Sequence, residues 1–243
     1  MKDLLSDVIR HANGLFDPIK VTGTSKSTTF QSVDKDRNLF FCAEAKIPVP
    51  EFEGEFGITN LGLLKGLLDL PSYKTPTASF GVKRRLWKDS ETVELFQFRD
   101  AKGAGADFRC MSADLVPDQP AIGKIPWDIE IKPDAATHAE FSQLAGLYAR
   151  VDALFGTETK NGNLMFTLGD QSASTHQASM VYAEGVSAQL KDDLLWNATF
   201  FLTVMKVAGE CDKTIKITNR NVFGIEFETS LAVYKYFIRA KTR

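Results

Sequence analysis

A proline-rich stretch near the middle of the chain separates two segments whose predicted elements follow the same order. Residues 112–126 contain three prolines and one glycine and show no apolar period, which is typical of a connector. An internal repeat limits the possible folds, because each copy must bury corresponding faces with the same succession of helices and strands. The sequence therefore predicts two domains, residues 1–111 and 127–243, joined by a connector at 112–126.

The first segment opens with an amphipathic helix over residues 4–14, where apolar residues recur at helical spacing. Strands follow, and a Leu-rich helix that is capped by Thr59 and ends before Pro71 interrupts them. The predicted strands cover residues 30–33, 38–43, 55–58, 77–86, 92–99 and 107–111.

The second segment repeats this order. It begins with a strand at 127–132 and a helix at 135–150. Residues 200–203 are predicted as a short strand that ends in Thr, like residues 56–59, and they lead into a second helix that ends near Gly209. Further strands cover residues 163–168, 178–183, 213–218, 221–229 and 231–239. Identity between the segments is slight, so the repeat is one of pattern, and it predicts an α+β fold with two similar domains.

Charge along the chain is nearly balanced. The sequence has 29 Lys and Arg against 31 Asp and Glu, a formal net charge of -2, which excludes a polycation that coats nucleic acid over its whole surface. No run approaches the roughly 20 apolar residues of a membrane span. The acidic, interrupted start from Met1 to Asp7 is unlike a signal peptide, so we expect a cytoplasmic protein that does not contact membranes.

The sequence lacks motifs for catalysis or cofactor binding. It contains no glycine-rich phosphate loop and no G-x-S-x-G turn, and its three histidines have no metal-ligand spacing. Cys42, Cys110 and Cys211 lie far apart with no C-x-x-C pair, which argues against a zinc site or a disulfide framework. We therefore expect no enzyme activity, no cofactor and no metal.

Each predicted helix places one basic residue opposite its apolar stripe, mostly among small or neutral residues. These residues are Arg10, Lys65, Arg150 and Lys206. Sparse positive charge on a smooth surface suits a uniformly negative partner that is contacted without base reading, such as duplex phosphate. The alternative is that short helices have few exposed positions, so that one cation among them has no functional meaning.

Several segments resemble the DNA sliding clamp family, and most of all the clamps of T4-like bacteriophages. They are residues 40–43, 56–68, 163–166, 200–206 and 234–237. The resemblance implies a closed homotrimer with antiparallel sheets outside and helices lining a ring around double-stranded DNA, so that the four basic residues would face the hole. Members of this family usually have a strand before the first helix, whereas only Met1 and Lys2 precede it here.

The resemblance also implies a role in DNA replication, as a processivity factor that a separate clamp loader places on DNA and that tethers the replicative DNA polymerase. Clamps of this family bind short peptides of polymerase and loader in an apolar pocket beside the connector. Matching candidates are Leu115, Val116, Ile122, Tyr236, Phe237 and Ile238. These side chains could instead tie the connector to the core, and the chain could be a duplicated β-rich structural or ligand-binding protein without a DNA role.

Overall fold

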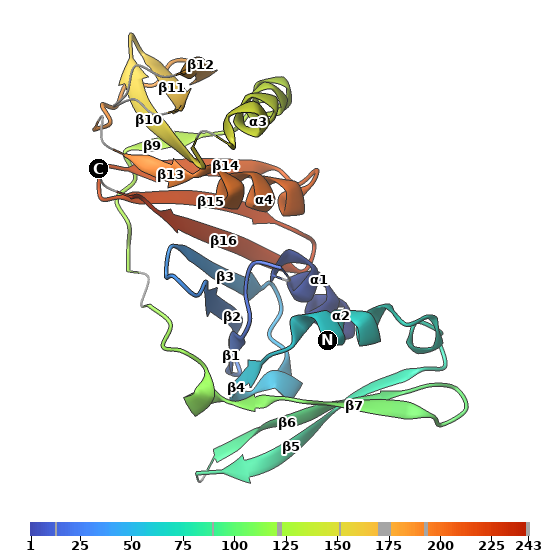
Figure 1. The fold of residues 1–243 in the computed structure, drawn as a ribbon. Coiled ribbons are helices and arrows are strands. Elements are labelled where there is room, and N and C mark those ends of the chain that lie inside the picture. The colour runs from blue at the N-terminus through green and yellow to red at the C-terminus, as the bar shows by residue number, and fades with distance from the viewer. Residues whose placement is uncertain are drawn as a thin grey trace. The chain divides into compact units, whose positions relative to one another are not determined.

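The computed structural model describes residues 1–12, 14–88, 90–120, 123–150, 152–169, 176–191 and 194–241. The chain divides into two compact units, whose elements are labelled in Figure 1. Unit 1 comprises Met1–Lys35, Phe40–Ala121 and Glu228–Tyr234, and unit 2 comprises Asp36–Leu39, Ile122–Phe227 and Lys235–Arg243. The main division falls between residues 121 and 122, inside the stretch expected to be a connector.

The described residues of unit 1 before residue 121 form two α-helices, each followed by four strands. The helices are α1 (Lys2–Ala12) and α2 (Leu61–Asp69). The strands are β1 (Ile19–Gly23), β2 (Thr28–Val33), β3 (Leu39–Ala45), β4 (Gly54–Ile58), β5 (Ser79–Trp87), β6 (Ser90–Arg99), β7 (Gly105–Arg109) and β8 (Met111–Ser112). Three short 3-10 helices, η1 (Pro50–Phe52), η2 (Pro71–Tyr73) and η3 (Ala113–Leu115), connect them.

Unit 2 has two helices in the same order among its strands, and an additional strand precedes the first helix. Its helices are α3 (Ala135–Tyr148) and α4 (Ala198–Ala208). Its strands are β9 (Ile129–Ile131), β10 (Leu154–Lys160), β11 (Asn163–Leu168), β12 (Ala178–Ala183), β13 (Leu195–Asn197), β14 (Lys213–Thr218), β15 (Val222–Glu228) and β16 (Ala232–Arg239). The division between the units cuts through β16.

Each unit contains two runs of hydrogen-bonded strands. In unit 1 the orders are β8-β4-β1-β2-β3 and β5-β6-β7, and in unit 2 they are β16-β15-β14-β9 and β12-β11-β10-β13. Side chains of β1 and β2 alternate between buried and half-buried positions. This alternation follows from the two-residue period of a strand that packs one face on the core.

The elements of the two units match one by one. Helix α1 corresponds to α3 and α2 to α4, while β1 to β7 correspond in order to β10 to β16. The ends also match, because β8 pairs with β4 after β7, and Lys241 forms a bridge with Leu195 of β13 after β16. The structure thus shows the repeated order predicted from the sequence, and among the described residues only β9 has no counterpart in unit 1.

Three strands, β1, β10 and β13, were not predicted, and the short strand predicted at residues 200–203 is wrong, since these residues lie within α4. The sequence of β10 does not alternate between apolar and polar residues, because one of its buried residues, Thr157, is polar and only 2% exposed. The Thr157 hydroxyl accepts a hydrogen bond of 2.8 Å from the indole nitrogen of Trp196 on β13. A buried hydroxyl is tolerated when it has such a partner, and the partner lies 39 positions away, beyond any local pattern.

The start of α2 differs from the expectation that Thr59 caps it. Asn60 has left-handed backbone geometry, φ 56°, and its side chain does not cap the helix. The carboxylate of Asp17 accepts hydrogen bonds from the backbone N–H of Asn60, at 3.0 Å, and from the Thr59 hydroxyl, at 2.8 Å. A negative charge at a helix N-terminus is favourable, so a residue distant in sequence supplies the cap.

Aromatic side chains fill the core of each unit. In unit 2 the ring of Phe141 on α3 lies 5.2 Å from that of Phe155, 5.2 Å from that of Phe166 and 5.5 Å from that of Phe201. These edge-on contacts add to the free energy of burial. None of the helices in the described ranges is both long enough and apolar enough to span a membrane.

Candidate nucleic-acid interface

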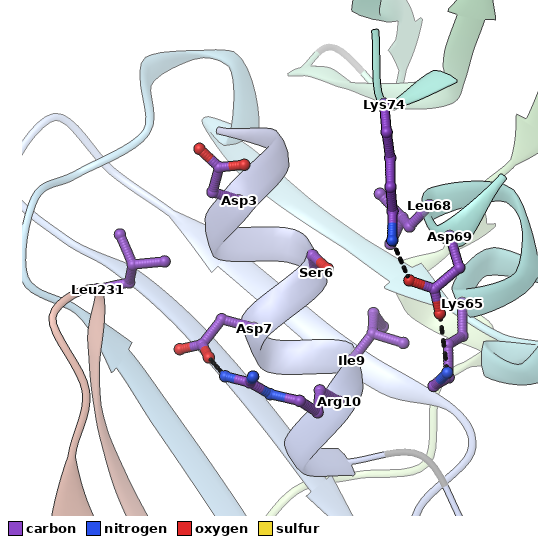
Figure 2. Close-up of a pocket in the computed structure, with 10 residues that line it drawn as sticks. All are labelled: Asp3, Ser6, Asp7, Ile9, Arg10, Lys65, Leu68, Asp69, Lys74 and Leu231. Atoms are coloured by element: carbon purple, nitrogen blue, oxygen red, sulfur yellow. Dashed lines mark hydrogen bonds and ion pairs between the residues drawn. The ribbon is translucent and has the colours of Figure 1, made fainter. Parts of the chain in front are cut away.

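Helices α1 and α2 of unit 1 line a common hollow of about 430 Å³ (Figure 2). Their apolar stripes are buried, at Leu5 and Val8 on α1 and at Leu64 on α2, which leaves their polar faces outward. Arg10 and Lys65 are exposed and both line the hollow. The structure therefore brings together the two basic residues that were singled out on these helices.

Each basic side chain in this hollow contacts a carboxylate. Arg10 donates to Asp7 one helical turn before it. The ammonium groups of Lys65 and Lys74 donate to separate oxygens of Asp69, at 2.8 and 2.9 Å (Figure 2). Three basic and three acidic residues line the hollow, so its formal charge is zero. Lys74 follows η2 and lies on no helix, and a search of helix faces could not have found it.

The bridge between Lys65, Asp69 and Lys74 fixes the charge state of the carboxylate. The hydrogen bond from Lys65, and next the one from Lys74, lower the pKa of Asp69 from 3.8 to about 2. The bridge is open to solvent, since the Lys65 and Asp69 side chains are 47% and 46% exposed. Exposed ion pairs are weak and are screened by salt, so an incoming phosphate can compete with Asp69 for both lysines.

The other carboxylate, Asp7, has a structural role. Its residue is only 6% exposed. Besides Arg10, it accepts hydrogen bonds of 2.7 Å from the Thr229 hydroxyl and 2.7 Å from the Tyr234 hydroxyl. A buried carboxylate is stable only when its oxygens are paired, and here the pairing ties α1 to the segment 228–234 of the same unit.

In unit 2 the two predicted basic residues occupy different settings. Lys206 lies in the last turn of α4 and is exposed, as expected from the sequence. Arg150 is exposed but lies beyond α3, which ends at Tyr148, so the assumption that the helix extends to residue 150 is wrong. Within its bounds α3 has no lysine or arginine. The four basic residues therefore divide into a close pair in unit 1 and two separate positions in unit 2.

Two exposed leucines on these helices were not singled out. Leu63 on α2 is 52% exposed, and Leu147 on α3 is 74% exposed. Both lie outside the buried stripe of their helix. Sequence periodicity does not distinguish an exposed leucine near the edge of a stripe from a buried one, because it records only residue type and spacing.

Most of the candidate residues for a peptide pocket are buried. Leu115, in η3, is 70% exposed, whereas Val116 is 6% exposed and packs on β4 so closely that a Cβ at Gly57 would lie 2.4 Å from it. On β16, Phe237 is stacked on Trp127 at 6.3 Å. The exposed fractions of the β16 candidates are 0% for Tyr236, 6% for Phe237 and 0% for Ile238. Ile122 lies outside the described residues.

Burial shifts the pKa of two histidines and one cysteine. Burial lowers the pKa of His11 and His138, so both rings are neutral at pH 7. The same cause raises the pKa of the Cys110 thiol. In the part of the chain that the structure describes, no group of three or more His, Cys, Asp or Glu side chains is placed to hold a metal ion.

Comparison with known proteins gives evidence for the fold but not for a sequence family. No protein-family model matches the sequence, and no curated protein matches it. Among solved structures, the chain is similar to one in a structure of the C-terminal region of FEN-1 bound to A. fulgidus PCNA, with a TM-score of 0.69 and 12% identity. The match covers 100% of this chain and 97% of the other. The protein therefore has a clamp-like fold over its entire length.

Proposed function

We propose that the protein is a DNA sliding clamp that tethers a replicative DNA polymerase to duplex DNA. The observation that carries the proposal is the clamp-like fold, which extends over the whole chain at a TM-score of 0.69 and contains the repeated order of elements. The proposal includes no catalytic role, because a clamp holds DNA by encircling it. It extends to the finer assignment made from the sequence, a clamp of the type encoded by T4-like bacteriophages.

A ring requires the chain to associate with copies of itself. Strands β7 and β12 are each the last strand of their sheet in the described ranges, so each has one unpaired edge. Pairing of β12 of one copy with β7 of the next is a head-to-tail contact, which closes into a ring when the rotation per copy is right. Closure also covers edges that would otherwise promote aggregation. We propose a ring of three copies.

The paired cations suit a protein that slides. Arg10, Lys65, Arg150 and Lys206 are proposed to face the DNA, with Lys74 as an addition from the structure. Because Lys65 and Lys74 already share the carboxylate of Asp69, a phosphate that binds them must displace this carboxylate, and each contact gains little free energy. Weak contacts leave retention to topology and permit fast movement along the duplex.

Retention on DNA whose ends are blocked tests the proposal without a loader. The protein is incubated with a bead-bound linear duplex, the free end is then closed with a bulky protein, and the beads are washed in about 1 M salt, which screens charge contacts. A ring stays bound through the wash and is released when a restriction enzyme cuts the duplex. Loss in the wash, or retention after cutting, would contradict encirclement.

Charge reversal then tests the DNA-facing residues. The variants Lys65→Glu and Lys206→Glu are expected to reduce the amount threaded onto DNA, whereas Lys102→Glu, in the exposed turn between β6 and β7, serves as the matched control. Equal loading of all three would remove these residues from the interface.

Solution mass separates the proposal from the alternative of a duplicated structural or ligand-binding protein without a DNA role. A clamp has about three times the 26.9 kDa of one chain, whereas a stable monomer at working concentration would argue for the alternative. A clamp must also bind a polymerase and a loader. For that contact Leu115 is the most accessible of the described candidates, since the others are buried.

A further inference from the structure

The outer edge of β5 has no partner strand in the described part of unit 1. In its sheet the order is β5-β6-β7, so β5 pairs with β6 on one side only. The corresponding strand of unit 2, β14, is paired on both sides, with β15 and with β9. Strand β9 is the one element without a counterpart in the described residues of unit 1 (Figure 1). The pairing of β9 with β14 therefore shows how a neighbouring strand covers the edge that corresponds to the open edge of β5.

Strand β9 covers β14 through an alternating apolar and acidic pattern. Ile131 pairs with Ile215, Glu130 with Lys216, and Ile129 with Ile217, all antiparallel. The Lys216 ammonium lies 2.8 Å from Glu226 on β15 and 3.7 Å from Glu130 on β9. The lysine is thus enclosed by a carboxylate on each neighbouring strand, and its side chain is only 16% exposed.

Unit 1 contains one of these two lysine–carboxylate contacts, the one within the sheet, and lacks the one to an added strand in the described residues. The Lys83 ammonium on β5 lies 3.1 Å from Glu94 on β6, as Lys216 on β14 lies near Glu226 on β15. The side chain of Lys83 is 57% exposed, since no strand lies on its other side in the described residues. The edge ends in an apolar tip, where Leu86 is 71% exposed and Trp87 is 42% exposed.

We infer that the outer edge of β5 binds an extended acidic segment of a partner protein, which adds to the sheet as β9 does in unit 2. Main-chain hydrogen bonds to an exposed edge supply affinity in this mode, and alternate side chains supply specificity. Lys83 selects a glutamate or aspartate opposite it, and Val82 beside it favours an apolar neighbour of that acidic residue. The exposed tip at Leu86 and Trp87 extends the contact surface for such a segment.

Charge argues against a second copy as the occupant. Residues 83–85 are Lys-Arg-Arg, so pairing of β5 with β5 of another copy would bring like charges together across the edge. The same basic residues attract an acidic strand. This inference is independent of the proposed DNA role, because the edge needs neither a ring nor DNA.

Binding of a designed peptide to the full-length protein tests the inference. The probe is a fluorescent peptide of nine residues, the length of β5, in which Ile and Glu alternate. The control peptide has Lys in place of Glu. We expect saturable binding of the acidic peptide, measured by fluorescence polarisation, and slower amide hydrogen exchange within residues 79–87. Absence of saturable binding at about 1 mM, or equal binding of the basic peptide, would overturn the inference.

Variants locate the contact. Lys83→Glu is expected to weaken peptide binding about five-fold or more, and the neutral Lys83→Gln by a smaller factor. Lys102→Glu, in the β6–β7 turn of the same sheet, should leave binding unchanged. Thermal melts check that each variant is folded. If Lys83→Glu binds as the unaltered protein does, or if protection from exchange falls outside β5, the edge is not the site.

A short DNA duplex distinguishes a peptide site from general attraction of anions. Duplex DNA should leave hydrogen exchange in β5 unchanged. Protection of β5 by DNA equal to that by the acidic peptide would mean that the edge attracts anions without selecting a strand, which also overturns the inference. Because this readout is confined to β5, failure here leaves the clamp proposal standing, and failure of DNA retention leaves the strand-addition site standing.

Discussion

The helices of unit 1 and unit 2 occupy corresponding places in the repeat but differ in the charge that they carry. In unit 1 a hollow between α1 and α2 gathers six charged residues, and its cations are paired with carboxylates. In unit 2, α3 has no lysine or arginine, and α4 has Lys206 alone. The apolar stripes recur while the charges do not, because burial constrains only the inward positions. The exposed positions of the helices can therefore differ in charge between the two units, whereas the buried positions stay apolar.

The largest expected effect is on the apolar core that the repeat shares. Phe141→Ala removes the α3 ring that contacts four other aromatic rings, and it should lower the free energy of unfolding by about 3–5 kcal/mol. Leu147→Ala on the same helix is the control, since that side chain is 74% exposed, and it should change stability by less than about 0.5 kcal/mol. Chemical denaturation measures both. Similar losses for the two variants would contradict this account of the core.

The second largest effect on stability is expected from the buried carboxylate of Asp7 in unit 1. Asp7→Asn removes the charge that pairs with Arg10, and an amide cannot accept from all the present donors, so stability should fall by about 2 kcal/mol. Asp3→Asn, on the exposed face of the same helix, should have little effect. The same denaturation experiment compares them. An unchanged midpoint for Asp7→Asn would show that the buried carboxylate is replaceable by a neutral group.

The exposed bridge should affect DNA binding more than stability. Asp69→Asn frees Lys65 and Lys74 from their shared partner, so if the clamp proposal holds, affinity for duplex DNA at low salt should rise about three-fold with a steeper salt dependence. The control is Asp212→Asn, at an exposed position after α4. A DNA titration at several salt concentrations measures the difference. Equal affinities would mean that Asp69 does not compete with phosphate.

The smallest effect is a local titration. The carboxyl of Asp69 should titrate with a pKa of about 2 in an NMR experiment, and Lys65→Met should raise it towards 3.8 because the largest stabilising hydrogen bond is lost. The sign follows from the lowered pKa: the ion pairs are fully present above pH 3.8 and are lost as the pH falls through about 2. Lys206→Met, in unit 2, should leave this titration unchanged. A normal pKa in the unaltered protein would show that the bridge does not persist in solution.

Sequence patterns predicted the repeat because each of its elements has a side-chain period that can be recognised within a short segment. The stripe of α1 and the alternation in β2 and β11 follow from side-chain periods of one helix or one strand. Patterns failed where a distant residue supplied the missing interaction. Trp196 makes a buried Thr157 acceptable in β10, and Asp17 replaces Thr59 as the cap of α2.

The candidate site was predicted in part. Arg10 and Lys65 could be chosen from helix faces, and the structure places both at one hollow. Lys74 could not, because it follows the short 3-10 helix η2 and lies on no helix face, although it is only five positions from Asp69. Arg150 was assigned to a helix that ends two residues earlier, since apolar spacing fixes the middle of a helix better than its end.

The sequence by itself determined the fold class, the two-part order of elements and the absence of a strong net charge, because these depend on residue type and spacing along the chain. Only the tertiary structure decided which distant residues meet and, in the described part of the chain, which strand edges stay open. Asp7 accepts hydrogen bonds from Thr229 and Tyr234, and β5 lacks the neighbour that β14 has, because of how segments that are separate in sequence pack together. Such contacts arise from packing, and packing joins residues regardless of their distance along the chain.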